Sequence, residues 1–102
     1  MFQSKLANQS IDELFEAILL LETQEECYRF FEDLATVGEL QSMAQRLAVA
    51  KMLTQDEKYT DIAEETGAST ATISRVKRCL NYGADGYKLI LKKLEEQKSL
   101  HL

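Results

Sequence analysis

The residues best suited to bind a charged partner lie in one stretch, from Ser69 to Tyr82. It contains three cations, Arg75, Lys77 and Arg78, and no acid. Small polar side chains precede the cations; these can contact base edges at close range, whereas lysine and arginine suit phosphate oxygens. The candidate DNA-contacting residues are therefore Ser69, Thr70, Ala71, Thr72, Ser74, Arg75, Lys77 and Arg78.

These side chains belong to a longer stretch, Tyr59 to Tyr82, which has the pattern of a helix-turn-helix. Gly67 falls at the expected turn, where a left-handed backbone conformation is needed and a side chain is costly. Ala63 is small enough to let the two helices approach closely, and Ser69 or Thr70 can cap the second helix. We therefore expect two short helices joined by a glycine turn.

Apolar residues of the second helix recur at i, i+3 and i+7, as Ile73, Val76 and Leu80, which predicts that they form its inward face. Helical geometry then assigns to the outward face Ala71, Arg75, Arg78 and Tyr82. This face is small and polar near the start of the helix and basic farther along. A similar hairpin can instead dock on a protein, so a helical protein-interaction module is the alternative hypothesis.

Three capping-box patterns precede this hairpin, and each predicts the start of a helix. The pairs are Ser10 with Glu13, Thr23 with Glu26, and Thr36 with Glu39. The first helix is expected over about residues 11–22, and the third is expected to be the longest. The inner face of the longest helix is predicted to contain Leu40, Met43, Leu47, Ala50 and Met52 or Leu53.

A last helix is expected after the hairpin, because Gly83 suits a helix stop and Asp85 a new cap. Its apolar side chains, which can pack back on the core, are Tyr87, Ile90, Leu91 and Leu94. The chain has 102 residues with no proline and four glycines, a composition that favours one all-α domain with short connections. Within it we expect a helical dimerisation core (1–58), the helix-turn-helix (59–82) and a C-terminal helix (84–102).

Several function classes are disfavoured by what the sequence contains. No apolar run approaches the roughly 18 residues that span a membrane, and the start lacks a signal-peptide core, so a cytoplasmic protein is expected. Cys27 and Cys79 are far apart in helical patterns and are expected to be reduced and partly buried. His101, the lone histidine, lies at the end of the chain. Neither an enzyme nor a metal or cofactor site is predicted.

Charge and apolar residues are unevenly distributed along the chain. Residues 1–38 hold two cations and eight acids, whereas residues 39–102 hold ten cations and nine acids. The acids are therefore concentrated away from the candidate DNA-contacting stretch. The first two helices are also rich in apolar residues for so small a protein, so we expect a homodimer that covers part of this surface.

The segment GASTATISR, residues 67–75, with QRLAVAKML ahead of it and six predicted helices around it, resembles the tryptophan repressor family. The YerC/YecD-type branch of that family is the most similar. The resemblance covers most of the chain and implies an intertwined, all-helical homodimer that binds double-stranded DNA, with its two reading heads in successive major grooves. The first reading helix departs from the family pattern at Tyr59, Thr60 and Ala63, so the operator is not carried over.

The resemblance also implies a candidate effector pocket, formed by Thr36, Arg46, Arg75, Val76 and Cys79. Tryptophan-responsive members hold the indole between two arginines, here Arg46 and Arg75. Val76 replaces a glycine that leaves space for the ligand, and Cys79 replaces a serine that lines the pocket. Overpacking typically costs about 1–3 kcal/mol, so tryptophan is not the expected effector. Such a protein could bind DNA constitutively, and the competing possibility is a smaller or differently shaped effector with a carboxylate or phosphate.

Overall fold

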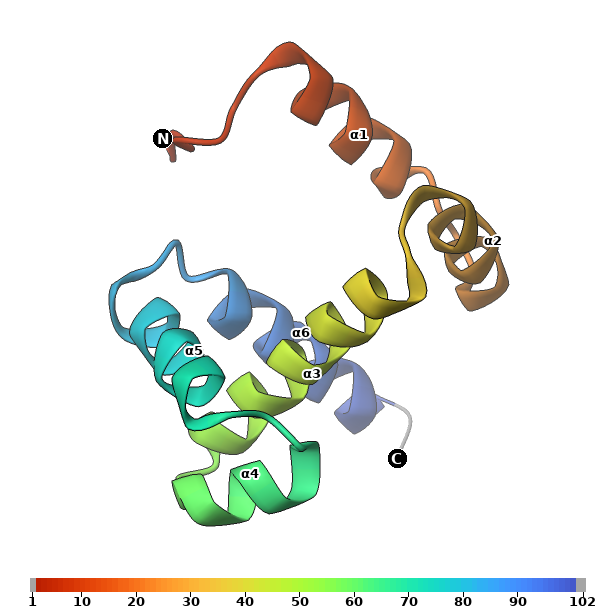
Figure 1. Cartoon of the computed structure of the whole chain (residues 1–102). Coiled ribbons are helices and arrows are strands. Elements are labelled where there is room, and N and C mark those ends of the chain that lie inside the picture. Colours follow the sequence, from red (N-terminus) through yellow and green to blue (C-terminus); the bar gives the residue numbers. More distant parts are fainter. Residues whose placement is uncertain (1, 101–102) are drawn as a thin grey trace. The chain divides into compact units, whose positions relative to one another are not determined.

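The computed structural model describes residues 2–100, which form six α-helices without strands (Figure 1). The helices are α1 (Gln9–Leu19), α2 (Gln24–Leu34), α3 (Val37–Thr54), α4 (Tyr59–Thr66), α5 (Thr70–Tyr82) and α6 (Gly86–Leu100). The all-α class and the six helices expected from the sequence are confirmed. His101 lies outside the described residues. The chain divides after Val37 into two compact units, the first with α1 and α2 and the second with nearly all of α3 and the remaining helices.

The start of α1 differs from the sequence prediction. Asn8, not Ser10, caps this helix, and its side-chain oxygen accepts a hydrogen bond from the Ile11 N–H at 2.9 Å. Asparagine is as good a cap as serine and stands two residues earlier, so the helix begins sooner. It also ends sooner than expected, at Leu19, because the next two N–H groups bond three residues back and tighten the chain into a turn.

The start of α2 follows the capping-box prediction with one change. Thr23 accepts a hydrogen bond from the Glu26 N–H at 3.1 Å, as expected. The Glu26 carboxylate accepts from the N–H of Glu22, one residue before the cap, at 2.9 Å. Both interactions satisfy N–H groups that the first helical turn leaves without a partner. The residue at which α2 begins is therefore determined by the local sequence.

No residue of α1 or α2 is buried. The predicted apolar face of α1 is only half-buried at Ile11, Leu14 and Ile18, while Phe15 is exposed. On α2 the rings of Phe30 and Phe31 meet edge to face, with centroids 5.5 Å apart, and both remain half-buried. The first unit thus contains apolar side chains that it does not cover itself.

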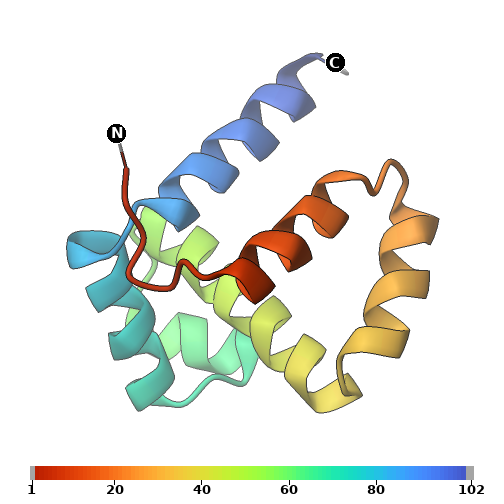
Figure 2. The ribbon, with the colours of Figure 1, turned by 90° about the horizontal axis from the view of Figure 1, so that it is seen from above.

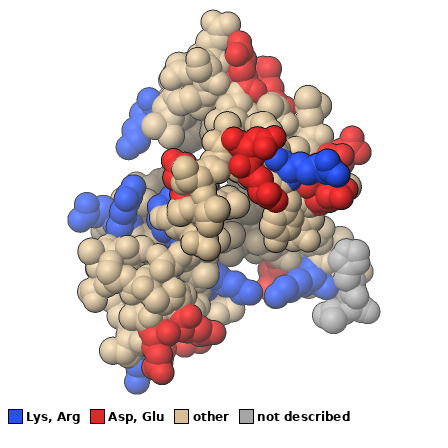
Figure 3. Space-filling model, turned by 45° about the vertical axis from the view of Figure 1, so that its right-hand side comes forward, with Lys and Arg blue, Asp and Glu red and all other residues tan. Residues whose placement is uncertain are grey.

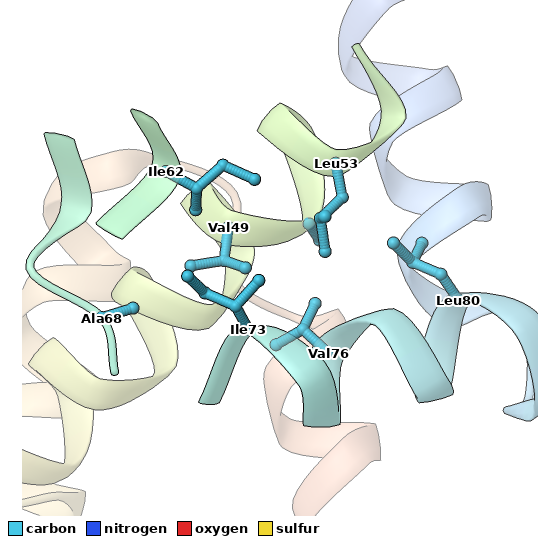
Figure 4. Close-up of a cluster of buried hydrophobic side chains, with 8 residues drawn as sticks. Val49, Leu53, Ile62, Ala68, Ile73, Val76 and Leu80 are labelled. Carbon is cyan, nitrogen blue, oxygen red and sulfur yellow. The ribbon is translucent and has the colours of Figure 1, made fainter. Parts of the chain in front are cut away.

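The core lies in the second unit, where the C-terminal half of α3 runs beside α4 and α5 (Figures 1 and 2). Its buried side chains are Val49, Ala50, Leu53, Ile62, Ala68, Ile73, Val76 and Leu80. Figure 4 shows these side chains converging from the three helices and the turn between α4 and α5. Full burial of such aliphatic side chains contributes about 1.5–3 kcal/mol each, so this cluster holds the helix-turn-helix against α3.

The inner face of α3 is predicted correctly only in its second half. Ala50 and Leu53 are buried, but Val49, which is fully buried, was not predicted. Met43 and Leu47 remain 41% and 36% exposed. Their side chains lie on a stripe rotated away from Val49 and Leu53, because successive residues of a helix are about 100° apart. The helix therefore has two apolar stripes, and this unit buries only one of them.

The C-terminal helix α6 also packs with only part of its predicted face. Tyr87 and Leu91 lie against the core, whereas Ile90 and Leu94 stay exposed. Gly83 ends α5 as expected, although its φ of −87° is not left-handed. Glycine is required there for space, since a Cβ atom would overlap the carbonyl of Cys79. None of the described helices combines the length and hydropathy needed to cross a bilayer.

Candidate nucleic-acid interface

The turn between α4 and α5 is built around a left-handed glycine, as the sequence predicts. Gly67 has a φ of 73°, and its N–H donates to the carbonyl of Ala63 at 2.9 Å. A residue with a Cβ atom rarely adopts this conformation, so glycine sets the direction in which the chain leaves α4. Ala63 is half-buried against the core, which agrees with the need for a small side chain between the two helices.

Thr66 holds the turn from its α4 side. Its hydroxyl donates to the carbonyl of Ile62 at 2.7 Å and accepts from the N–H of Ala68 at 3.1 Å. The Ala68 side chain beyond it is buried in the core. The turn is therefore fixed by side-chain hydrogen bonds on one side of Gly67 and by apolar packing on the other.

The second helix of the hairpin begins with a serine cap. Ser69 accepts a hydrogen bond from the Thr72 N–H at 3.1 Å, and its hydroxyl donates to the Thr72 hydroxyl at 3.1 Å. Of the two caps that the sequence allowed, Ser69 is the one used, and Thr70 is the first helical residue. These bonds order the first turn of α5, where the candidate base-contacting side chains lie.

The inward and outward faces of α5 are those predicted. Ile73 and Val76 are 0% and 1% exposed, and Leu80 is also buried. The exposed face contains Ala71, Arg75, Arg78 and Tyr82. Among the eight candidate DNA-contacting residues, Thr72 and Lys77 are half-buried and the other six are exposed. The helix therefore presents a small polar first turn followed by cations, on a backbone that the core keeps in place.

Charges on the two helices of the hairpin have opposite signs. Among residues 2–100, the three cations of α5 form no ion pair with an acid, so their charge is available to a partner. In contrast, α4 carries three exposed acids, Asp61, Glu64 and Glu65. Figure 3 shows that both acidic and basic side chains are exposed on one face of the molecule. An anionic partner would therefore be attracted to α5 rather than to α4.

The residues of the candidate effector pocket lie on several elements. Arg46 is half-buried on α3, where its Nη1 donates to the Ser42 hydroxyl at 3.0 Å. Arg75, Val76 and Cys79 lie on α5, and Thr36 precedes α3 in the first unit. Cys79 is exposed, contrary to the partial burial expected, because it lies outside the stripe of Ile73, Val76 and Leu80; Cys27 is half-buried as predicted.

Val76 packs in the interior of the second unit. Its side chain points toward Val49 and Leu53 of α3, as Figure 4 shows. Arg75, its neighbour in sequence, is exposed on the other side of the helix. The methyl groups of Val76 thus belong to the core that supports α5.

Comparison with known proteins places the chain in a family. A family model described as Trp repressor protein matches residues 9–95. The uncharacterized protein YerC of Bacillus subtilis (strain 168) is 57% identical over 95 residues, which cover 93% of this chain and 91% of YerC.

Two solved structures have the same fold. A candidate Trp repressor from Staphylococcus aureus is 58% identical, with a TM-score of 0.86 over 89% of this chain and 91% of its own. A TrpR-like protein from Eubacterium eligens ATCC 27750 is 55% identical, with a TM-score of 0.86 over 89% and 94% of the two chains. The chain therefore belongs to the Trp repressor protein family, as a member of its YerC type.

Proposed function

We propose that this protein is a transcriptional regulator, most simply a repressor, that recognises a specific DNA sequence as a homodimer. The observation that carries the proposal is the exposed face of α5, where small polar side chains in a capped first turn are followed by cations that form no ion pair within residues 2–100. Membership of the Trp repressor family supports the same conclusion. A binding role, rather than catalysis, also agrees with the regulatory character of that family.

The two ends of α5 have different roles in this proposal. The exposed residues of its first turns, Ser69, Thr70, Ala71 and Ser74, contact base edges, because short side chains let the helix approach the floor of the major groove. Thr72, half-buried and bonded to the cap, supports this turn. Farther along, Arg75, Lys77 and Arg78 hold phosphates and set the register on the duplex.

The homodimer is supported by apolar side chains that one chain leaves uncovered. They include Leu19 of α1, which is 83% exposed, Met43 and Leu47 of α3, and Ile90 of α6. A second copy would bury such surface, and two copies would double the phosphate contacts of a helix-turn-helix, residues 59–82, that has only three basic residues.

Charge complementarity also supports a second copy as the partner. Residues 1–38 carry a net charge of −6, from two cations and eight acids. A groove between the end of α3 and α6 is lined by four lysines, Lys51, Lys88, Lys92 and Lys98, with one acid, Glu95. The acidic first unit of one protomer would therefore be attracted to this groove of its partner.

Tryptophan is not the effector in this proposal. Val76 is 1% exposed and packs against Val49 and Leu53, so little free volume remains beside it for an indole ring. Inserting a ring there would require the core to expand, and overpacking typically costs about 1–3 kcal/mol. Among residues 2–100, Arg46 and Arg75 form no ion pair with an acid, so both would suit DNA phosphates or a smaller anionic effector.

One observation favours the alternative, a protein partner for the hairpin. The acids of α4, Asp61, Glu64 and Glu65, are exposed and would be repelled by phosphates if α4 lay along a DNA backbone. A gel-shift titration with mixed genomic fragments at several salt concentrations distinguishes the two functions. A regulator retains a reproducible subset of fragments whose affinity falls with salt, whereas a protein-interaction module retains no subset at any salt concentration.

A further inference from the structure

The carbonyl group at the end of α4 receives a hydrogen bond from a distant side chain. Helices end with carbonyls that have no partner within the helix, and Thr66 lies in this position. The Gln45 Nε2 on α3 donates to the Thr66 carbonyl at 3.1 Å, and the bond is partly buried. It joins residues 21 apart in the sequence, whereas the neighbouring bond from Arg46 to Ser42 stays within one turn.

Gln45 itself is held in place by the core. It lies one helical turn before Val49, on the same side of α3, and Val49 is fully buried between the helices of the hairpin. The Gln45 amide also lies close over the turn, since a Cβ atom added at Gly67 would be 3.9 Å from its Nε2. The side chain therefore lies beside the space above the left-handed glycine and bonds to the carbonyl before it.

Thr66 links the hydrogen bond from Gln45 to the start of α5. Its carbonyl accepts from Gln45, its hydroxyl donates to Ile62, and the same hydroxyl accepts from the N–H of Ala68. Ala68 is followed directly by Ser69, the cap of α5. Hydrogen bonds and the short chain segment from Ala68 to Ser69 thus connect α3 to the first turn of α5.

We propose that Gln45 is a positioning residue for DNA recognition. It fixes the orientation of the turn between α4 and α5, and with it the orientation of the first turn of α5. This role rests on the proposed DNA-binding function. Apolar packing around Ile73 is non-directional and tolerates small rotations of a helix, whereas a hydrogen bond constrains both distance and angle. Base contacts need that constraint more than phosphate contacts do, because a shift of about 1 Å misplaces a short side chain at a base edge.

Three substitutions distinguish the effect of the hydrogen bond from the effect of the volume that the Gln45 side chain occupies. Gln45→Met keeps the length of the side chain without a donor, and Gln45→Glu keeps its shape but presents only acceptors when ionised. Gln45→Lys retains a donor that can reach the Thr66 carbonyl. The matched control is Gln41→Met, the same change on the exposed residue one turn earlier on α3.

The experiment measures the affinity of each full-length variant for a duplex selected by the wild-type protein and for a scrambled duplex of equal length. We expect Gln45→Met and Gln45→Glu to lose about five- to tenfold in affinity for the selected duplex, as for one neutral hydrogen bond, and less than about twofold for the scrambled one. Gln45→Lys and Gln41→Met should keep the wild-type ratio between the two duplexes. The amide resonances of Gly67 and Ala68 should move in Gln45→Met but not in Gln41→Met.

Each of the other outcomes refutes either the proposed function or the role of Gln45. A wild-type protein that does not distinguish the two duplexes contradicts the proposed function, and this role with it. The second outcome is that the wild type distinguishes the two duplexes and Gln45→Met distinguishes them equally well. If circular dichroism shows that Gln45→Met is folded, this outcome refutes only the role of Gln45. Equal losses on both duplexes would also refute it, since they indicate general destabilisation. If Gln45→Met does not fold, the Gln45→Glu and Gln45→Lys pair makes the same comparison.

Discussion

Val76 is the residue at which the structure makes its strongest prediction about stability. It is 1% exposed and lies between α3 and α5 in the core. Val76→Ala removes two methyl groups, which at about 0.8 kcal/mol for each buried group of this size amounts to about 1.6 kcal/mol of lost transfer free energy. The cavity that remains adds to this loss, so we expect the free energy of unfolding to fall by about 2–3 kcal/mol.

The assay for Val76 is urea unfolding followed by circular dichroism, at one fixed protein concentration because a dimer is proposed. Val37→Ala is the matched control, since it makes the same chemical change at a valine that is 72% exposed. The control should change the free energy of unfolding by less than about 0.5 kcal/mol. Equal values for the two variants would refute the assignment of Val76 to the core, and with it the argument that Val76 closes the effector pocket.

Three further predictions concern the turn, the dimer and the effector. Gly67→Ala should lower the free energy of unfolding by about 1–2 kcal/mol, because alanine is strained at a φ of 73°; an unchanged urea midpoint would argue against the left-handed turn. Sedimentation at micromolar concentration should give twice the chain mass for the wild type and a lower mass for Leu47→Glu, and a folded wild-type monomer would exclude the dimer. Calorimetry with L-tryptophan should give no saturable heat, and tighter DNA binding in its presence would show that Val76 leaves the pocket open.

Features set by neighbouring residues could be predicted from the sequence. Gly67 is left-handed, Ser69 caps α5, and the stripe of Ile73 and Val76 is buried, because each depends on spacing within one or two helical turns. The start of α1 was predicted wrongly because two adequate caps, Asn8 and Ser10, stand close together. Local rules rank such caps equally and cannot choose between them.

Features set by tertiary packing could not be predicted in the same way. Helix α3 has apolar residues on two stripes. Its sequence does not indicate which stripe packs against the hairpin; in the structure the stripe with Val49 does so, and Leu47 stays exposed. The hydrogen bond from Gln45 to Thr66 leaves no signal at all, because a glutamine 21 residues away from its acceptor has no characteristic spacing. Among the candidate DNA-contacting residues, Thr72 and Lys77 are half-buried, and this also depends on how α5 packs against the other helices.

The measurement that tests the central claim most directly is the salt dependence of DNA binding by the wild type and by Arg78→Ala. Arg78 is exposed on α5, has no acidic partner among residues 2–100, and is assigned to a phosphate. The wild type should prefer its selected duplex over a scrambled one, and Arg78→Ala should weaken both about equally and flatten the slope of log affinity against log salt by roughly one unit. A wild type without sequence preference, or an Arg78→Ala variant that alters preference and leaves the salt slope unchanged, would contradict this account of α5.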